Sequence, residues 1–357
     1  MRKLVHIVLL AAALLAASCE RRPLLELSDT HYVRIYLNEE IKNVTTGFYN
    51  EDNVRPVYEA PGIIRVTLAN LQTGDVVAER FLRDRGCDEK GTYYEGYIAV
   101  PPGTYSLMAY NYDMETTRVK GENCHWEAKA YTNEIASHLK SRIPSRFKSP
   151  GSTKTNGYDK VVYDPDHLFR VCCQDVNIPY TDFIDTLRTQ DGEYFRAESM
   201  VLSYYLQVRV KGLQFASSAV GLITGLSGSG WIQEGNMDMD DPVSVYFDML
   251  PGQGSAAGVV KSEDGDEVIV YTTFNTFGKI PNMQNELEIT FDFVTTYGEP
   301  FSENLDISQV FASEVAKEHQ WLLIEHTIEI PEPPEVNNGG FDPGTEPWKD
   351  KDTDIII

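Results

Sequence analysis

Short runs in which apolar and polar residues alternate recur along most of this 357-residue chain. Residues 31–37 place Val33, Ile35 and Leu37 on one face, and residues 64–68 and 76–78 repeat the pattern. A period of two is that of a β-strand with one face in a core and the other toward water. The alternation therefore predicts a chain built mainly of short strands.

The longest alternating run covers residues 200–211. We expect its core face to carry Met200, Leu202, Tyr204, Leu206, Val208 and Val210, and its water face Ser203, Gln207, Arg209 and Lys211. A run of this length indicates a strand that covers one side of a hydrophobic core. Because a turn at Asp191-Gly192 precedes it, we place a domain boundary near Phe195.

Further elements follow from the same patterns and from turn residues. We expect strands at residues 93–111 (with a Pro-Pro-Gly turn at 101–103), 160–163, 168–173, 219–224, 243–249, 258–261, 267–277, 286–296 and 321–330. Short helices are expected at 132–142 and 308–318, and loops at 83–92 and 145–157. Many short strands separated by turns occur in each half of the chain. They predict an all-β fold of two tandem antiparallel β-sandwiches, at 31–195 and 196–331.

The first 18 residues have the pattern of a secretory signal peptide. Arg2 and Lys3 precede an almost wholly apolar run at residues 4–17, which is shorter than a typical transmembrane helix. Ala16-Ala17-Ser18 then lead into Cys19. This order resembles a bacterial lipobox, in which the cysteine is acylated and becomes the mature N-terminus. Residues 19–30 would then be a lipidated tether. The alternative is ordinary cleavage after Ser18, which leaves Cys19 as a thiol.

Residues 332–357 differ from the rest of the chain. Pro, Gly, Asn and Glu dominate up to Pro347, and such a composition builds no packed element. Trp348 and the terminal Ile355, Ile356 and Ile357 follow, and an apolar end of this kind favours pairing with a sheet edge. We interpret the segment as a linker with a candidate donor strand that pairs in cis or in trans. A disordered terminus is the alternative.

Charge and cysteine content narrow the classes of partner. The net charge of −23 becomes about −25 without Arg2 and Lys3, which disfavours nucleic acid and anionic lipid headgroups. Contact with a membrane is therefore expected through the lipid alone. Cys87, Cys124, Cys172 and Cys173 have spacings that determine no disulfide pairing.

The sequence shows no catalytic motif, no metal site and no cofactor motif that we would assign. His319 and His326 lie seven residues apart and fit no zinc pattern. Asp238, Asp240 and Asp241 could ligate calcium, but Asp-rich turns are usually only solvated. Candidate aromatic residues for stacking on sugars are Tyr93, Tyr94, Tyr97, Trp126 and Tyr131, although each fits a core or sheet-face role better.

Several short segments resemble the fimbrillin-like lipoproteins of Bacteroides-type bacteria. They are residues 19–24, 100–105, 225–228, 276–278 and 339–344, together with Trp348. The resemblance implies two transthyretin-like Greek-key sandwiches and an outer-membrane, cell-surface lipoprotein without enzymatic activity, an anchor, accessory or tip subunit with a role in adhesion. Other fimbrial subunits, joined by strand addition, and a host or glycan ligand would be its partners. The alternative function is a glycan-binding lipoprotein that serves a polysaccharide uptake system.

Overall fold

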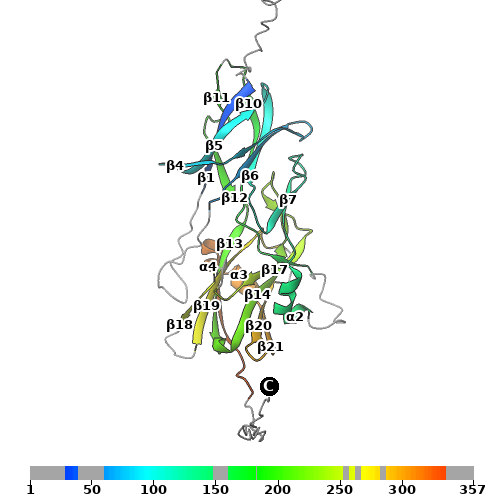
Figure 1. Ribbon diagram of the computed structural model, residues 1–357, viewed down its shortest axis with the longest axis vertical. Coiled ribbons are helices and arrows are strands. Elements are labelled where there is room, and N and C mark those ends of the chain that lie inside the picture. The colour runs from blue at the N-terminus through cyan, green and yellow to red at the C-terminus, as the bar shows by residue number, and fades with distance from the viewer. Residues whose placement is uncertain are drawn as a thin grey trace, which may run out of the picture.

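The computed structural model describes residues 29–38, 60–147, 160–181, 183–251, 257–261, 267–281 and 287–334. These residues form several β-sheets with a few short helices between them (Figure 1). The predicted all-β fold with short helices in loops is therefore confirmed. Trp348 and the three terminal isoleucines lie outside the described residues, as does Cys19.

We call the upper part of Figure 1 the first body. It contains β1 (Thr30–Leu37), β2 (Ile64–Asn70), β3 (Val76–Leu82), β4 (Asp84–Asp88), β5 (Gly91–Ala99), β6 (Gly103–Asn111), β10 (Phe169–Ile178), β11 (Asp185–Thr186) and β12 (Phe195–Ser199). Their order is β3-β2-β6-β10-β12-β1-β5-β4, with β11 beside β1. The sheet folds over, so that Val33 and Ile35 of β1 share a buried core with Val66 of β2 and Leu107 of β6.

The second body lies below and has two facing sheets (Figure 1). One sheet contains β13 (Leu202–Lys211), β18 (Gly258–Lys261), β19 (Glu267–Thr276) and β22 (Trp321–Glu329). The other contains β9 (Val161–Tyr163), β14 (Ala216–Ser227), β17 (Pro242–Asp248), β20 (Glu288–Thr295) and β21 (Pro300–Asp306). Leu206, Phe247, Phe274 and Phe291 pack in the core between them. Helices α3 (Ser308–Ala312) and α4 (Glu314–His319) lead into β22, and η3 (Leu213–Phe215) joins β13 to β14.

A smaller sheet lies between the two bodies and combines distant parts of the chain. It contains β7 (Thr117–Lys120), β8 (Lys129–Thr132), β15 (Ser229–Trp231) and β16 (Asn236–Met237). Downstream, η2 (Ser137–Arg142) and α2 (Pro144–Phe147) pack on β20 of the second body, and β9 pairs with β17. Many of the described residues in 117–147 and 160–163 therefore contact the second body, although the sequence pattern placed them in the first.

These pairings bear on the domain boundary expected near Phe195. Phe195 starts β12, which pairs with β10 and β1, and its side chain is buried in the first core. Met200 and Val201 then pack in a cluster between the bodies, and β13 begins at Leu202. We propose two bodies that meet at Met200 and Val201, with residues 117–147 and 160–163 shared between them.

Most strand pairs are antiparallel, as predicted, but four are parallel: β1 with β11, β1 with β12, β9 with β17, and β13 with β22. Alternation within one strand does not indicate the direction of its neighbour, and parallel neighbours need long connections that a local pattern does not contain. The loop expected at residues 83–92 is also wrong in part. Residues 84–88 form the exposed edge strand β4, in which both faces are polar.

Strand β13 confirms most of the predicted core face, but not the exposure predicted for Gln207. Tyr204, Leu206, Val208 and Val210 are in the core as expected, but Leu202 is 40% exposed. Gln207 was expected to face water and is only 3% exposed, because Tyr205, Trp321 and Tyr271 cover the other face of the sheet. Both faces of β13 are therefore covered along much of its length.

Three of the four described cysteines lie in strands, Cys87 in β4 and Cys172 and Cys173 in β10. Cys87, Cys124, Cys172 and Cys173 are free thiols in the structure, and burial raises the pKa of Cys172 to about 11. In the part of the chain that the structure describes, no helix is both long and apolar enough to cross a membrane.

Candidate functional site

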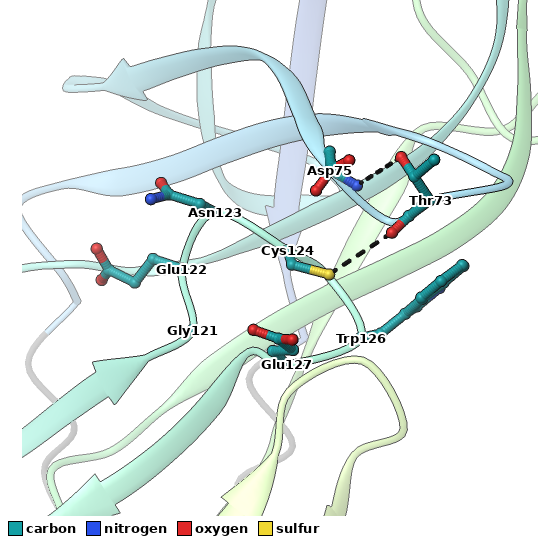
Figure 2. Close-up of a pocket in the computed structure, with 8 residues that line it drawn as sticks. All are labelled: Thr73, Asp75, Gly121, Glu122, Asn123, Cys124, Trp126 and Glu127. Carbon is teal, nitrogen blue, oxygen red and sulfur yellow. Dashed lines mark hydrogen bonds between the residues drawn. The ribbon is translucent and has the colours of Figure 1, made fainter.

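A surface pocket of about 630 Å³ lies between the β2–β3 turn and the loop that joins β7 to β8. Its lining residues are Thr73, Asp75, Gly121, Glu122, Asn123, Cys124, Trp126 and Glu127. Figure 2 shows Trp126 on one side of Cys124, with Glu122 and Asn123 on the other. Hydroxyl, carboxylate, amide and indole groups thus surround one hollow at the surface of the first body.

The loop is attached to the sheet below it by His125. The His125 side chain is 1% exposed, and its Nε2 and Nδ1 lie 2.9 Å from Thr67 Oγ1 and 3.1 Å from Ser106 Oγ. Burial, and then the charge of Arg65, lower the pKa of His125 to about 4, so the imidazole is neutral at pH 7. The neighbouring Trp126, by contrast, is 51% exposed.

Backbone hydrogen bonds join the loop to the turn opposite. His125 N donates to Gly74 O at 2.8 Å, and Val76 N donates to Asn123 O at 2.9 Å. Gly74 has φ +76°, and a Cβ atom there would lie 2.8 Å from Trp126 Cδ2 and 3.0 Å from Cys124 Sγ. Only glycine combines this backbone conformation with so close an approach of the indole. The Trp126 ring therefore rests on the turn.

Arg65 of β2 holds the start of the loop. Its guanidinium is buried, lies 3.6 Å from Glu122 Oε2 and 2.9 Å from Glu79 Oε2, and donates to Tyr110 Oη at 2.7 Å. Burial opposes the charge of Arg65, but Tyr110, Glu79 and Glu122 outweigh it and raise the pKa of Arg65. One wall of the pocket is thus positioned by a buried cation under the loop.

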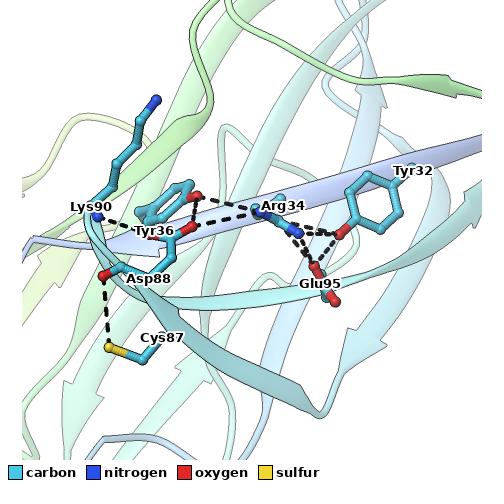
Figure 3. A network of polar contacts seen from close by, with 7 residues as sticks. All are labelled: Tyr32, Arg34, Tyr36, Cys87, Asp88, Lys90 and Glu95. Carbon is cyan, nitrogen blue, oxygen red and sulfur yellow. Dashed lines mark hydrogen bonds and ion pairs between the residues drawn. The ribbon is translucent and has the colours of Figure 1, made fainter.

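A second polar cluster covers the outer face of β1, β4 and β5 (Figure 3). Arg34 Nη2 lies 2.6 Å from Glu95 Oε2, and Arg34 also stacks 4.1 Å from the centre of the Tyr93 ring. Tyr36 Oη donates to Asp88 Oδ2 at 2.7 Å. Burial, and then the Glu95 carboxylate that its hydroxyl contacts, raise the pKa of Tyr32 to about 12. Cross-strand ion pairs and stacked rings therefore hold this face together.

The structure separates the aromatic residues that the sequence analysis selected. Tyr94 is fully buried in the first core, so it is no ligand contact. Tyr93 lies in the Arg34 cluster, and Tyr97 is 54% exposed beside Tyr32. Tyr131 is half-buried near Lys120. Of the five, only Trp126 lines the pocket.

Two of the three candidate calcium residues have lysine partners. Lys129 contacts the carboxylate of Asp238, and Lys160 Nζ lies 3.4 Å from Asp241 Oδ1, while Asp240 is exposed. His326 contacts Glu303 of β21, whereas His319 lies at the end of α4. Within the described ranges no three His, Cys, Asp or Glu side chains gather in a metal-binding group.

Arg34, Arg65 and His125 were missed from the sequence. The polar face of residues 31–37 does show Tyr32, Arg34 and Tyr36 at every second position, which could have indicated a cross-strand cluster. Nothing comparable marks Arg65 or His125, because their partners come from other strands and loops. The predicted lipidation site Cys19 and the tail residues Trp348, Ile355, Ile356 and Ile357 lie outside the described residues and stay predictions.

Fold and site together define an all-β protein with a polar surface pocket, and comparisons with known proteins show what this chain is similar to. Residues 83–248 match a family model described as a domain of unknown function, DUF5119. The chain is 26% identical over 246 residues to a protein named "Putative fimbrium anchoring subunit Fim4B" from Bacteroides ovatus. The match covers 69% of this chain and 60% of that relative, so the chain spans less than two thirds of the relative's length. The predicted resemblance to fimbrial proteins of Bacteroides-type bacteria is confirmed.

The chain is also similar to solved structures, among them the following two. One, titled a "putative adhesin" from Bacteroides ovatus, is 22% identical, with 88% of this chain and 94% of that chain covered and a TM-score of 0.49. The other is the fimbrial anchor protein Mfa2 from Porphyromonas gingivalis, which is 13% identical, with 80% and 85% covered and a TM-score of 0.40.

Proposed function

We propose that this protein is a cell-surface component of a fimbrium, with anchoring its first candidate role and accessory or tip subunit the others. The observation that carries the proposal is the similarity over 246 residues to a protein named as a fimbrium anchoring subunit. That name describes a structural protein, which supports a non-enzymatic role in assembly and adhesion.

Lipid attachment at Cys19 is the first part of this proposal. An anchoring subunit must hold a filament to the cell, and two or more acyl chains bury enough methylene groups, at about 0.8 kcal/mol each, for stable attachment. The signal-like residues before Cys19 support acylation there. The outer membrane is then the proposed location, with the acidic body held away from the lipid headgroups.

Assembly by strand addition is the second part. In the second body, β21 pairs with β20 and β22 pairs with β13, and no other described strand occupies their outer edges. An added strand gains about 0.5–1.5 kcal/mol net for each main-chain hydrogen bond. We propose that such an edge accepts a donor strand, and that residues 348–357 are this protein's own donor.

The two edges are not equally suited to accept a strand. Strand β22 has an irregularity where Val208 pairs with Ile324 and Arg209 with Thr327, so that Glu325 and His326 are inserted between the pairs. The inserted His326 contacts Glu303 of β21. Bulges and charged side chains protect sheet edges from pairing. We therefore place the acceptor first at β21, where the pairing with β20 is regular.

Two variants of the full chain test the proposal in the native cell. Cys19→Ala should release the protein from membranes and abolish labelling by palmitate, whereas the matched control Cys87→Ala should stay attached. Deletion of residues 341–357 should leave the melting temperature unchanged and abolish incorporation into fimbriae or binding to another subunit. A soluble, unlabelled wild-type protein would refute lipid attachment. A deletion variant that assembles normally would refute the donor role.

A further inference from the structure

Trp126 offers a flat apolar platform whose position is set before any ligand arrives. Gly74 supports the ring from below, and the buried His125 beside it restrains the backbone. Half of the side chain is exposed to the pocket and to water. An aromatic side chain that is already held in place loses little conformational entropy when it binds.

The side chains around this platform have unused hydrogen-bonding capacity. Those of Asp75, Asn123 and Glu127 make no hydrogen bond with the described part of the chain. Carboxylates accept hydrogen bonds only, whereas the amide of Asn123 both donates and accepts. Hydrogen bonds to an ionised carboxylate are about twice as strong as those between neutral groups. A ligand with several hydroxyl groups matches this set.

We propose that the pocket binds a neutral carbohydrate, with the C–H face of one sugar ring stacked on Trp126. Hydroxyl groups of the sugar donate to the carboxylates of Asp75 and Glu127, and Asn123 donates to a hydroxyl oxygen. The volume of about 630 Å³ is within the range of small-molecule sites, roughly 300–1,000 Å³. The pocket would add ligand recognition to this chain independently of its assembly into a fimbrium.

The charge of the site selects among carbohydrates. Asp75, Glu122 and Glu127 line the pocket in a chain of net charge −23, so sugars that carry carboxylate or sulfate groups are repelled. Glu122 is partly neutralised by Arg65, but Asp75 and Glu127 have no described cation beside them. A cationic peptide would also satisfy the carboxylates, but a sugar ring combines a flat C–H face for Trp126 with several hydroxyl groups for the surrounding side chains, so we favour the neutral sugar.

Binding to the purified full chain tests the proposal. The probes are neutral oligosaccharides of glucose, mannose, xylose and N-acetylglucosamine, with sialyllactose, oligogalacturonate and oligolysine as charged comparisons, measured by titration calorimetry. At least one neutral probe should bind with a saturable isotherm. Absence of binding by all neutral probes, or binding of oligolysine alone, would overturn the proposal.

Variants then locate the site. Trp126→Ala should weaken binding about tenfold or more, as truncation of a central aromatic contact does, and Glu127→Gln should weaken it less. Tyr180→Ala is the matched control, because Tyr180 is 73% exposed and lies outside the pocket. Equal affinity in Trp126→Ala and wild type, at equal melting temperatures, would place any sugar site elsewhere. Trp126→Ala should still enter fimbriae, so the outcome is separate from that of the assembly proposal.

Discussion

Nε2 of His125 lies 2.9 Å from Oγ1 of Thr67, in the interface between the pocket loop and the outer face of β2. The imidazole is neutral there, because its pKa is lowered to about 4 from an ordinary 6.5. Between these two values the unfolded chain binds the proton and the folded chain does not. Acid therefore favours unfolding in this window.

The first prediction is a loss of stability as pH falls from about 6.5 to 4. His125 should contribute about 3 kcal/mol to this loss, since one pKa unit corresponds to about 1.36 kcal/mol. His167, whose pKa burial also lowers to about 4, adds a loss of the same sign. Denaturant unfolding at a series of pH values measures the slope.

The variant His125→Gln isolates the contribution of this one group. It should be less stable than wild type at pH 7.5, by about 1–3 kcal/mol for the mismatched hydrogen bonds, and the difference should shrink toward pH 4. Desolvation raises the pKa of Asp164 to about 7, which gives an opposite slope in both proteins. Wild type and variant are therefore compared at each pH. Parallel curves would show that His125 does not titrate as described.

The second prediction concerns the core of the second body. Leu206 is fully buried between the two sheets, so Leu206→Ala should lower the free energy of unfolding by about 2–5 kcal/mol. Lys211→Ala, at the exposed end of the same strand, should change it by less than about 0.5 kcal/mol. Thermal unfolding of both variants provides the measurement. Similar losses in the two would mean that the core does not lie where β13 places it.

Strand β13 also shows how far the sequence predicts this fold. The burial of Tyr204, Leu206 and Val208 on one face follows from alternation alone, because all three are apolar and occupy every second position. The burial of Gln207 does not, because Trp321, which covers this face, comes from a strand more than 100 residues later. The edge strand β4 shows no alternation of apolar and polar residues for another reason, because neither of its faces contacts a core.

The candidate site was likewise predictable from the sequence only in part. Trp126 could be selected from the sequence as an aromatic residue in a polar segment. Its support by Gly74 and the anchoring of its loop to Arg65 and Thr67 of β2 could not, because these contacts join residues about 50 or more positions apart. Residue type indicated a stacking group, and the tertiary structure shows which of the five aromatic candidates has a pocket.

The third prediction compares two lysine–aspartate pairs near the bodies' junction. Lys129 is 7% exposed, contacts Asp238 and lies 5.0 Å from the centre of the Trp231 ring. Lys129→Met leaves Asp238 desolvated without its cation and should cost about 3–5 kcal/mol. Lys160→Met breaks a more exposed pair with Asp241 and should cost at most about 1 kcal/mol.

A double variant tests the cause of that loss. Adding Asp238→Asn to Lys129→Met removes the unpaired charge and keeps an acceptor for the backbone N–H of Asp240, which lies 3.0 Å away. Most of the lost stability should return, because the cost comes from the uncompensated carboxylate. Equilibrium unfolding in urea measures it. No recovery would assign the loss to the packing of the Lys129 side chain on Trp231.

The fourth prediction tests the proposed donor strand by the alternation of its side chains. In a strand, Ile355 and Ile357 project to one face and Ile356 to the other. If the tail adds to a sheet edge and pockets select alternate side chains, the two faces contribute unequally. The pair Ile355→Asp and Ile357→Asp should therefore reduce incorporation into fimbriae more than Ile356→Asp, with the melting temperature unchanged in both. A fall in melting temperature would instead indicate pairing with the protein's own sheet. Equal incorporation into fimbriae by the wild type, the double variant and Ile356→Asp would mean that the terminal isoleucines donate no strand.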